Sequence, residues 1–366
     1  MENQNEDLNS EFFEHFPYIE KGKYDWEIIS VSKDAQNKRS VFYGINKVNA
    51  NDYIYVKQIK INFSQINNIE NINILREIYF LVLLINQNYI VQLNDILLDS
   101  EINCKHLFLI FKGNSVSLNK LISFQGNDYL SNKDLIKWII YQISFGLFIL
   151  HSNKIIHNDI KPSNILINEI GGITICDLGS ASFKGEDSFS YTRYYSAPEF
   201  LIDTSIKRDE KNDVWGLGVI IIELFLKRNL YFKNNGDKTN KSQLKVILSK
   251  FGINADIQNL TNEEIKQLIE ESYDKKIIFT NDEIEAIKNE NALELIQNLL
   301  SLNPKKRFNA EDILKSKYLI SDFKDFEPLT ANIKELKIQN FQNELIDNNK
   351  FVDIVVELRS KLNNSK

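Results

Sequence analysis

The feature that most limits what this chain can fold into is the order of two kinds of hydrophobic pattern along the sequence. Up to about Gly113 the apolar residues mostly alternate or form short runs, whereas afterwards they recur at helical spacing. Strands are expected at 26–31, 40–45, 53–61, 90–98 and 106–111, with one helix among them at 67–85. Later helices are expected at 118–124, 135–151 and 214–226, and in several pieces over 241–318. Strands first and helices afterwards predict an α+β chain with a small sheet domain and a larger helical domain.

Composition excludes several other classes. With 366 residues, 43% of them hydrophobic and 26% charged, the chain can bury a large core, unlike a disordered chain or a fibre. A net charge of −6 argues against binding to nucleic acid or to a membrane through a basic surface. Two cysteines, Cys104 and Cys176, cannot form a disulfide framework. The acidic start and the lack of an apolar run of about 20 residues predict an intracellular protein, cytoplasmic or nuclear.

Four segments follow from these patterns. We expect a flexible acidic arm at 1–23, the sheet domain at 24–113, the helical domain at 114–322 with an insert at about 233–290, and a helical tail at 323–366. In the tail, apolar residues recur at helical spacing at Phe351, Ile354, Val355, Leu358 and Leu362. The first interpretation is a helix that packs on its own domain, and a helix that binds a partner is the alternative.

The residues with the clearest chemistry lie between the two sets of patterns. Asp159, Lys161 and Asn164 fall within six residues, and Asp177 follows thirteen residues after Asn164. Such a set can orient a hydroxyl group, contact phosphate oxygens and hold Mg²⁺ through carboxylate and amide oxygens.

In this segment the chain resembles the eukaryotic protein kinases, and the resemblance extends over about residues 24–322. His157-Asn158-Asp159-Ile160-Lys161-Pro162-Ser163-Asn164 resembles the kinase catalytic loop. The resemblance implies a bilobal α+β fold and two catalytic residues, Asp159 as the base and Lys161 as the cation at the transferring phosphoryl group. It also implies that Asn164 and Asp177 bind Mg²⁺. The position of Lys161 is typical of serine/threonine kinases.

The resemblance also implies a nucleotide site. Ile54-Tyr55-Val56-Lys57 resembles the V-A-I-K strand motif, so Lys57 would contact the ATP phosphates and pair with Glu77. Further nucleotide contacts are expected at Val41, Phe111, Lys112 and Gly113. ATP and Mg²⁺ are therefore the expected cofactors, and a protein is the expected substrate. A regulatory partner would bind through the C-terminal helix or the N-terminal arm, and no nucleic-acid or membrane partner is expected.

Other motifs indicate the branch of the family. Ala197-Pro198-Glu199, Arg307 and Asp213 resemble elements that stabilise the kinase fold. The runs 176–182 (CDLGSAS) and 192–195 (TRYY), together with the insert, resemble the CMGC group. The glycogen synthase kinase, dual-specificity tyrosine-regulated and splicing-kinase branches are the most similar.

Four positions depart from the family pattern. The stretch 33–41 contains no glycine where a glycine-rich phosphate loop should lie. Asn158 replaces the arginine of H-R-D, Leu178 the phenylalanine of D-F-G, and Ser196 an arginine of the CMGC group. The leading hypothesis is an ATP- and Mg²⁺-dependent serine/threonine kinase. The alternative is a pseudokinase or weakly active kinase that acts as a scaffold.

Overall fold

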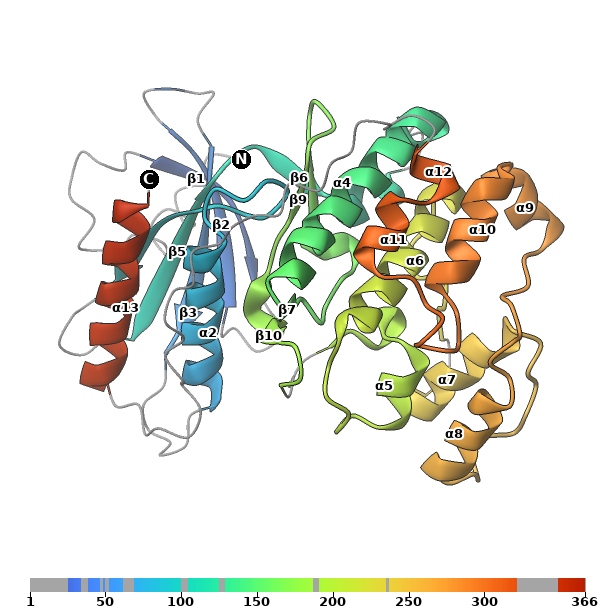
Figure 1. The fold of residues 1–366 in the computed structure, drawn as a ribbon. Helices are drawn as coiled ribbons and strands as arrows, with labels where there is room; N and C mark the ends of the chain where they lie inside the picture. Colours follow the sequence, from blue (N-terminus) through green and yellow to red (C-terminus); the bar gives the residue numbers. More distant parts are fainter. Residues whose placement is uncertain are drawn as a thin grey trace. The chain divides into compact units, whose positions relative to one another are not determined.

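The computed structural model describes residues 26–33, 39–46, 49, 53–61, 69–99, 105–124, 129–186, 191–234, 237–320 and 348–365. The expected N-terminal arm, the centre of the glycine-free stretch (34–38) and Cys104 lie outside these residues. The chain divides into two compact units (Figure 1). Unit 1 contains residues 1–115 and 333–366, and unit 2 contains residues 116–332.

Unit 1 contains an antiparallel sheet with the strand order β1-β2-β3-β5-β4. Its strands are β1 (Trp26–Lys33), β2 (Arg39–Asn46), β3 (Tyr53–Lys60), β4 (Leu93–Leu98) and β5 (His106–Lys112). The strand expected to begin at Ile90 begins at Leu93 instead. The Gln92 side chain explains the difference, because it accepts from the Asn86 amide and donates to the carbonyls of Leu84, Gln87 and Ile90. These bonds hold residues 84–92 in turns, with Asn86 and Tyr89 at positive φ.

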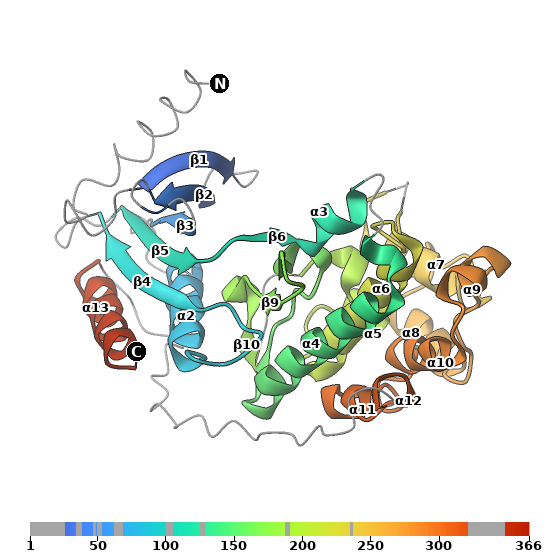
Figure 2. The ribbon, with the colours of Figure 1, turned by 90° about the horizontal axis from the view of Figure 1, so that it is seen from above.

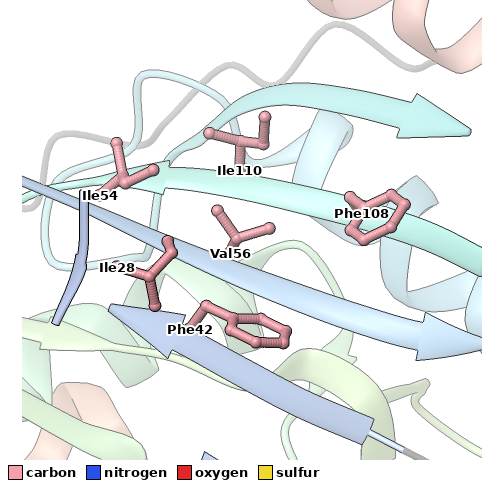
Figure 3. Packing of buried hydrophobic residues seen from close by; sticks show 6 residues of the cluster. All are labelled: Ile28, Phe42, Ile54, Val56, Phe108 and Ile110. Carbon is pink, nitrogen blue, oxygen red and sulfur yellow. The ribbon is translucent and has the colours of Figure 1, made fainter. Parts of the chain in front are cut away.

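Alternation along the strands gives the sheet two distinct faces. The core face carries a cluster of buried apolar side chains (Figure 3): Ile28, Phe42, Ile54, Val56, Phe108 and Ile110. The opposite face, here called the lysine face, carries Lys57, which is the register partner of Val41 on β2 and of Leu109 on β5.

Two helices from distant parts of the chain lie side by side in unit 1 (Figures 1 and 2). Helix α13 (Asn348–Asn364) packs against α2 (Ile69–Leu83) and β4. The α13 side chains with less than a tenth of their surface exposed are Phe351, Val352, Val355, Leu358 and Leu362. Arg359 adds a two-pronged ion pair to the buried carboxylate of Asp95, at 2.8 Å and 3.2 Å. The interpretation of the tail helix as one that packs on its own domain is confirmed.

Unit 2 is mostly helical. Its longer helices are α4 (Lys133–Ser152), α6 (Glu210–Leu226), α7 (Asn240–Ser249), α8 (Asn262–Glu270), α9 (Asn281–Ile287) and α10 (Glu290–Leu299). Shorter helices are α3 (Leu118–Ser123), α5 (Pro198–Ile202), α11 (Ala310–Leu314) and α12 (Lys317–Ile320). Its short strands are β6 (Ser115–Ser117), β8 (Ile165–Asn168) and β9 (Ile173–Ile175) in one sheet, and β7 (Ile155–Ile156) and β10 (Ser182–Phe183) in another.

Helices α4 and α6 form the centre of unit 2. Among the described residues, α4 is long and apolar enough to cross a membrane by length and composition alone, yet 56% of that stretch is buried within the protein. It packs against α6, and Ile136, Ile139 and Ile143 on α4 are fully buried. This burial is what a core helix of a globular unit shows. The insert supplies α7, α8 and α9, and the last two of these begin with capping boxes at Thr261 and Thr280.

Candidate active site

The expected site residues form two groups, one in each unit, and each group is described within its own unit. In unit 1, Val41, Lys57 and Phe111 all lie on the lysine face, because Val41 pairs with Lys57 and Phe111 pairs with Tyr55, two residues before Lys57. Gly113 follows β5 with φ 139°, a conformation that glycine adopts easily, and its amide donates to the Tyr53 carbonyl at 3.0 Å. The Lys112 amide donates to the Asn94 side chain.

Lys57 and Glu77 form an ion pair between β3 and α2. Lys57 Nζ lies 2.5 Å from Glu77 Oε1, and the Glu77 side chain is only 2% exposed. A carboxylate this deeply buried is stabilised by a paired cation, so the lysine is held in one place on the sheet. The second Glu77 oxygen, Oε2, has no hydrogen-bond donor among the residues that the structure describes. The expected pair therefore forms.

In unit 2, Asp213 at the start of α6 anchors the loop that carries the candidate catalytic residues. Its buried carboxylate accepts hydrogen bonds from the amides of His157 and Asn158, both at 2.8 Å, and from His151 Nε2 at 2.9 Å. His157 adds a second anchor, because its Nε2 donates to the Cys176 carbonyl while its Nδ1 accepts from the Asp159 amide. The expected structural role of Asp213 is confirmed.

Asp159, Lys161 and Asn164 meet at one point of this loop. Lys161 Nζ lies 2.6 Å from Asp159 Oδ2 and 2.8 Å from Thr192 Oγ1. Asn164 Nδ2 donates to the Asp159 carbonyl at 2.9 Å and to its Oδ2 at 3.2 Å. The other carboxylate oxygen, Asp159 Oδ1, accepts no hydrogen bond from the part of the chain that the structure describes. One oxygen of the carboxylate is thus held by two donors while the other keeps its lone pairs.

The group includes oxygen atoms that suit a hard cation. The Asn164 amide donates through its nitrogen, and its oxygen accepts no hydrogen bond from the described residues. Asp177 has φ 64° and ψ 71°, a left-handed conformation at the start of the turn at Leu178–Ser180. Leu178 is 1% exposed, so the leucine fills an apolar position. Mg²⁺ is commonly held by one or two side-chain oxygens together with phosphate oxygens, so the donor chemistry of Asn164 and Asp177 suits it. The Cys176 amide, one residue before Asp177, donates to the Asn164 carbonyl at 2.9 Å and holds the two segments together.

Asn158 is turned inward. It has φ 67°, a left-handed conformation that Asn tolerates better than most residues. Its Nδ2 donates to the Ser180 carbonyl at 3.0 Å and to Ser182 Oγ at 2.9 Å. The side chain therefore links the catalytic loop directly to the segment that follows Asp177.

The stabilising elements form as expected. Arg307 lies with its fully buried guanidinium 2.6 Å and 3.1 Å from the two Glu199 oxygens, and it also donates to the Ser301 carbonyl. Ser196 is buried, and its hydroxyl donates to the Thr192 carbonyl at 3.2 Å. Ser196, which stands where the CMGC group has an arginine, is therefore a small residue whose hydroxyl forms a hydrogen bond within its own turn.

Three features were missed in the sequence. Thr192, which binds Lys161, lies in the 192–195 run that was used only to assign the group. Arg208 is 1% exposed, and its guanidinium donates to no acceptor among the described residues. The guanidinium lies 4.3 Å and 5.2 Å from the ring centres of Phe200 and Tyr191. Tyr55 lies on the lysine face where the V-A-I-K motif has alanine. That replacement was visible in the motif itself.

A model of the protein kinase domain matches residues 38–319. The chain therefore belongs to the protein kinase family, with the α+β kinase fold of a sheet lobe and a helical lobe. A solved structure, MAP kinase LmaMPK10 from Leishmania major, has the same fold, with a TM-score of 0.69, 20% identity and coverage of 100% of both chains.

Curated relatives of this chain include mitogen-activated protein kinases. Mitogen-activated protein kinase HOG1 of Alternaria brassicicola is 34% identical over 196 residues, which cover 51% of this chain and 52% of the relative. Mitogen-activated protein kinase 2 of Arabidopsis thaliana is 30% identical over 284 residues, which cover 74% of this chain and 71% of the relative. The chain spans about half the length of the HOG1 relatives it matches. These relatives confirm the CMGC group, although the motifs had favoured three other branches of it.

Proposed function

We propose that this chain is an ATP-dependent serine/threonine protein kinase that uses Mg²⁺. The observation that carries the proposal is the contact of Lys161 with both Asp159 and Thr192. These contacts bring together, in one cluster, the proposed catalytic base, the cation that would bind phosphate, and the segment that precedes Ala197-Pro198-Glu199. The Lys57–Glu77 pair in unit 1 supports it, since a lysine held in this way can bind the α- and β-phosphates.

The proposed reaction moves the γ-phosphoryl group from ATP to a serine or threonine hydroxyl of a protein. The hydroxyl oxygen forms a bond to the γ-phosphorus, the bond to the β–γ bridging oxygen breaks, and ADP leaves. Asp159 accepts the hydroxyl proton, and Lys161 stabilises charge on the transferring group. Mg²⁺ bound by Asn164 and Asp177 would neutralise the phosphate charge. Protein substrates are proposed because the relatives are protein kinases.

A transfer assay tests this function. The full chain with labelled ATP, Mg²⁺ and a generic basic protein should label the protein, and Asp159→Asn should abolish the labelling. Calorimetry should show ATP binding that requires both Mg²⁺ and Lys57, with Lys57→Ala as the variant. Binding unaffected by Mg²⁺ or by Lys57→Ala would refute the proposed roles.

The second candidate is a pseudokinase or weakly active kinase that acts as a scaffold. The glycine-free stretch 33–41 favours it, because glycines let backbone amides approach phosphates closely and this stretch contains none. A scaffold would retain its fold but show no labelling above the Asp159→Asn background. For a regulatory partner, the apolar side of α13 is already covered by α2 and β4. A partner on this helix would therefore contact its outer side, where Val356 is 48% exposed.

A further inference from the structure

Three tyrosines form a cluster on the lysine face of unit 1. Tyr43 on β2 and Tyr55 on β3 are register partners, and Tyr53 lies two residues before Tyr55 on the same face. The Tyr43 ring stacks on Tyr53 with centres 5.7 Å apart, and its centre lies 4.9 Å from that of Tyr55. Burial, with the nearby Tyr55 and Tyr53 hydroxyls, raises the pKa of Tyr43 to about 12. Tyr43 therefore stays neutral, and the three rings form one packed cluster.

Hydrogen bonds hold two of these rings toward the chain that follows β5. The Tyr55 hydroxyl donates to the Ser115 carbonyl in a short hydrogen bond and accepts from the Ser115 amide at 3.2 Å. The Tyr43 hydroxyl donates to Asn114 Oδ1 at 3.3 Å. The Tyr55 side chain therefore reaches from β3 past Phe111 and Gly113 to Ser115.

This path coincides with the place where a nucleotide base is expected. In the proposed function the phosphates lie at Lys57 and the base lies beside Phe111–Gly113. Tyr55 is the register partner of Phe111, on the same face as Lys57 and about 7 Å from it along the strand. The phosphates at Lys57 and the base beside Phe111 belong to one molecule, and Tyr55 lies between these two places on β3. The base must therefore lie next to Tyr55. An alanine there ends at Cβ and leaves room, whereas the tyrosine ring fills the space.

We propose that Tyr55 limits the affinity of this chain for purine nucleotides. The base binds only when the Tyr55 ring gives up both hydrogen bonds to Ser115 and swings away. The triphosphate, held at Lys57, therefore supplies almost all of the binding. This inference rests on the proposed function for the position of the phosphates, and it adds a reason for weak nucleotide use that is independent of the glycine-free stretch.

A base could instead stack on the tyrosine rings, as bases do on aromatic platforms. The geometry favours obstruction, because both hydroxyls are tied to residues 114–115 and the Tyr55 ring is tilted by 38° from Tyr43 rather than parallel to it. The two possibilities predict opposite effects when the ring is removed.

The experiment compares two ligands by calorimetry on the full chain with Mg²⁺: ATP, and tripolyphosphate, which has no base. In the wild type the two dissociation constants should agree within threefold. In Tyr55→Ala, ATP should bind at least tenfold more tightly than in the wild type, while tripolyphosphate binding stays within threefold. Tyr55→Phe separates the two parts of the side chain, since it keeps the ring but removes the hydroxyl, and it should gain less than Tyr55→Ala.

Tyr53→Ala is the matched control, because it makes the same change on the same strand and face but further from Lys57. It should leave ATP affinity within threefold. Weaker ATP binding by Tyr55→Ala would overturn the proposal in favour of stacking, and unchanged or undetectable binding would overturn it outright. Phosphotransfer is measured separately on the same proteins. A Tyr55→Ala variant that binds ATP tightly but labels no protein would refute the proposed function while supporting this inference.

Discussion

Replacing Asp213 with asparagine should loosen the catalytic loop from α6. The carboxylate accepts three hydrogen bonds, from His151 Nε2 and from the His157 and Asn158 amides. An asparagine side chain has only one acceptor oxygen. In its best orientation this oxygen still accepts from the His157 amide, but the NH₂ group then faces the Asn158 amide, which is also a donor. A lost hydrogen bond to a charged group is worth about 1.5–3 kcal/mol, and the unsatisfied amide adds about 1–3 kcal/mol. We therefore expect Asp213→Asn to lower the free energy of unfolding of unit 2 by roughly 3–5 kcal/mol.

Urea unfolding followed by tryptophan fluorescence measures this loss. Trp138 and Trp215 both lie in unit 2, and Trp215 is fully buried two residues after Asp213. Asp203→Asn is the control, because Asp203 is exposed and its carboxylate accepts from the amide and the hydroxyl of the nearby Ser205. It should cost less than about 0.5 kcal/mol. A loss below about 1 kcal/mol for Asp213→Asn would show that the three hydrogen bonds do not anchor the loop. Phosphotransfer by the variant should also slow at least about tenfold, because the Asn158 amide precedes the proposed base.

Three further predictions concern other parts of the molecule. Burial raises the pKa of Glu223 to about 7, so this group stabilises the fold at low pH, and about 3 kcal/mol should be lost as pH rises from 4.5 through 7. Urea unfolding at several pH values should show that the free energy of unfolding depends less on pH in Glu223→Gln than in the wild type. The same pH dependence in both proteins would contradict the prediction. Arg359→Met removes the ion pair to the buried Asp95 carboxylate, but Arg359 is 39% exposed, so thermal unfolding should report a loss of only about 1–2 kcal/mol. The exposed pair at Lys361 is the control, and Lys361→Met should have no measurable effect. Finally, because Asn158 links the loop to Ser180 and Ser182 without a phosphate, phosphatase-treated protein should keep its activity, and loss of activity would refute this.

The parts of the site that lie close together in sequence were predictable. Asp159, Lys161 and Asn164 are within six residues, a set that can contact phosphate, and the resemblance to the kinase catalytic loop implied their roles. The structure brings their side chains together. The Lys57–Glu77 pair was implied by the resemblance of residues 54–57 to the V-A-I-K motif, and the structure forms it.

Features that depend on distant contacts were not predictable. The position of the Tyr55 ring depends on its register with Phe111 and on hydrogen bonds to Ser115, sixty residues away. The start of β4 depends on the Gln92 side chain, which satisfies a turn that local propensity does not reveal. Arg208 was not singled out in the sequence, and its buried charge is favoured by the rings of Tyr191 and Phe200 and by the nearby carboxylates of Asp213 and Glu199.

The return of α13 to unit 1 has a consequence for synthesis of the chain on the ribosome. Unit 2 is continuous, so it can fold once residue 332 has emerged, whereas unit 1 is completed only by residues near the end of the chain. Until then, the surface of α2 and β4 that later contacts Phe351, Val355 and Leu358 is open to water. Each nascent chain therefore passes through a stage in which unit 2 can already be folded, while unit 1, which carries Lys57, still lacks α13. Nonsense mutations far downstream of the candidate site should consequently yield aggregation-prone chains, although every candidate site residue is present.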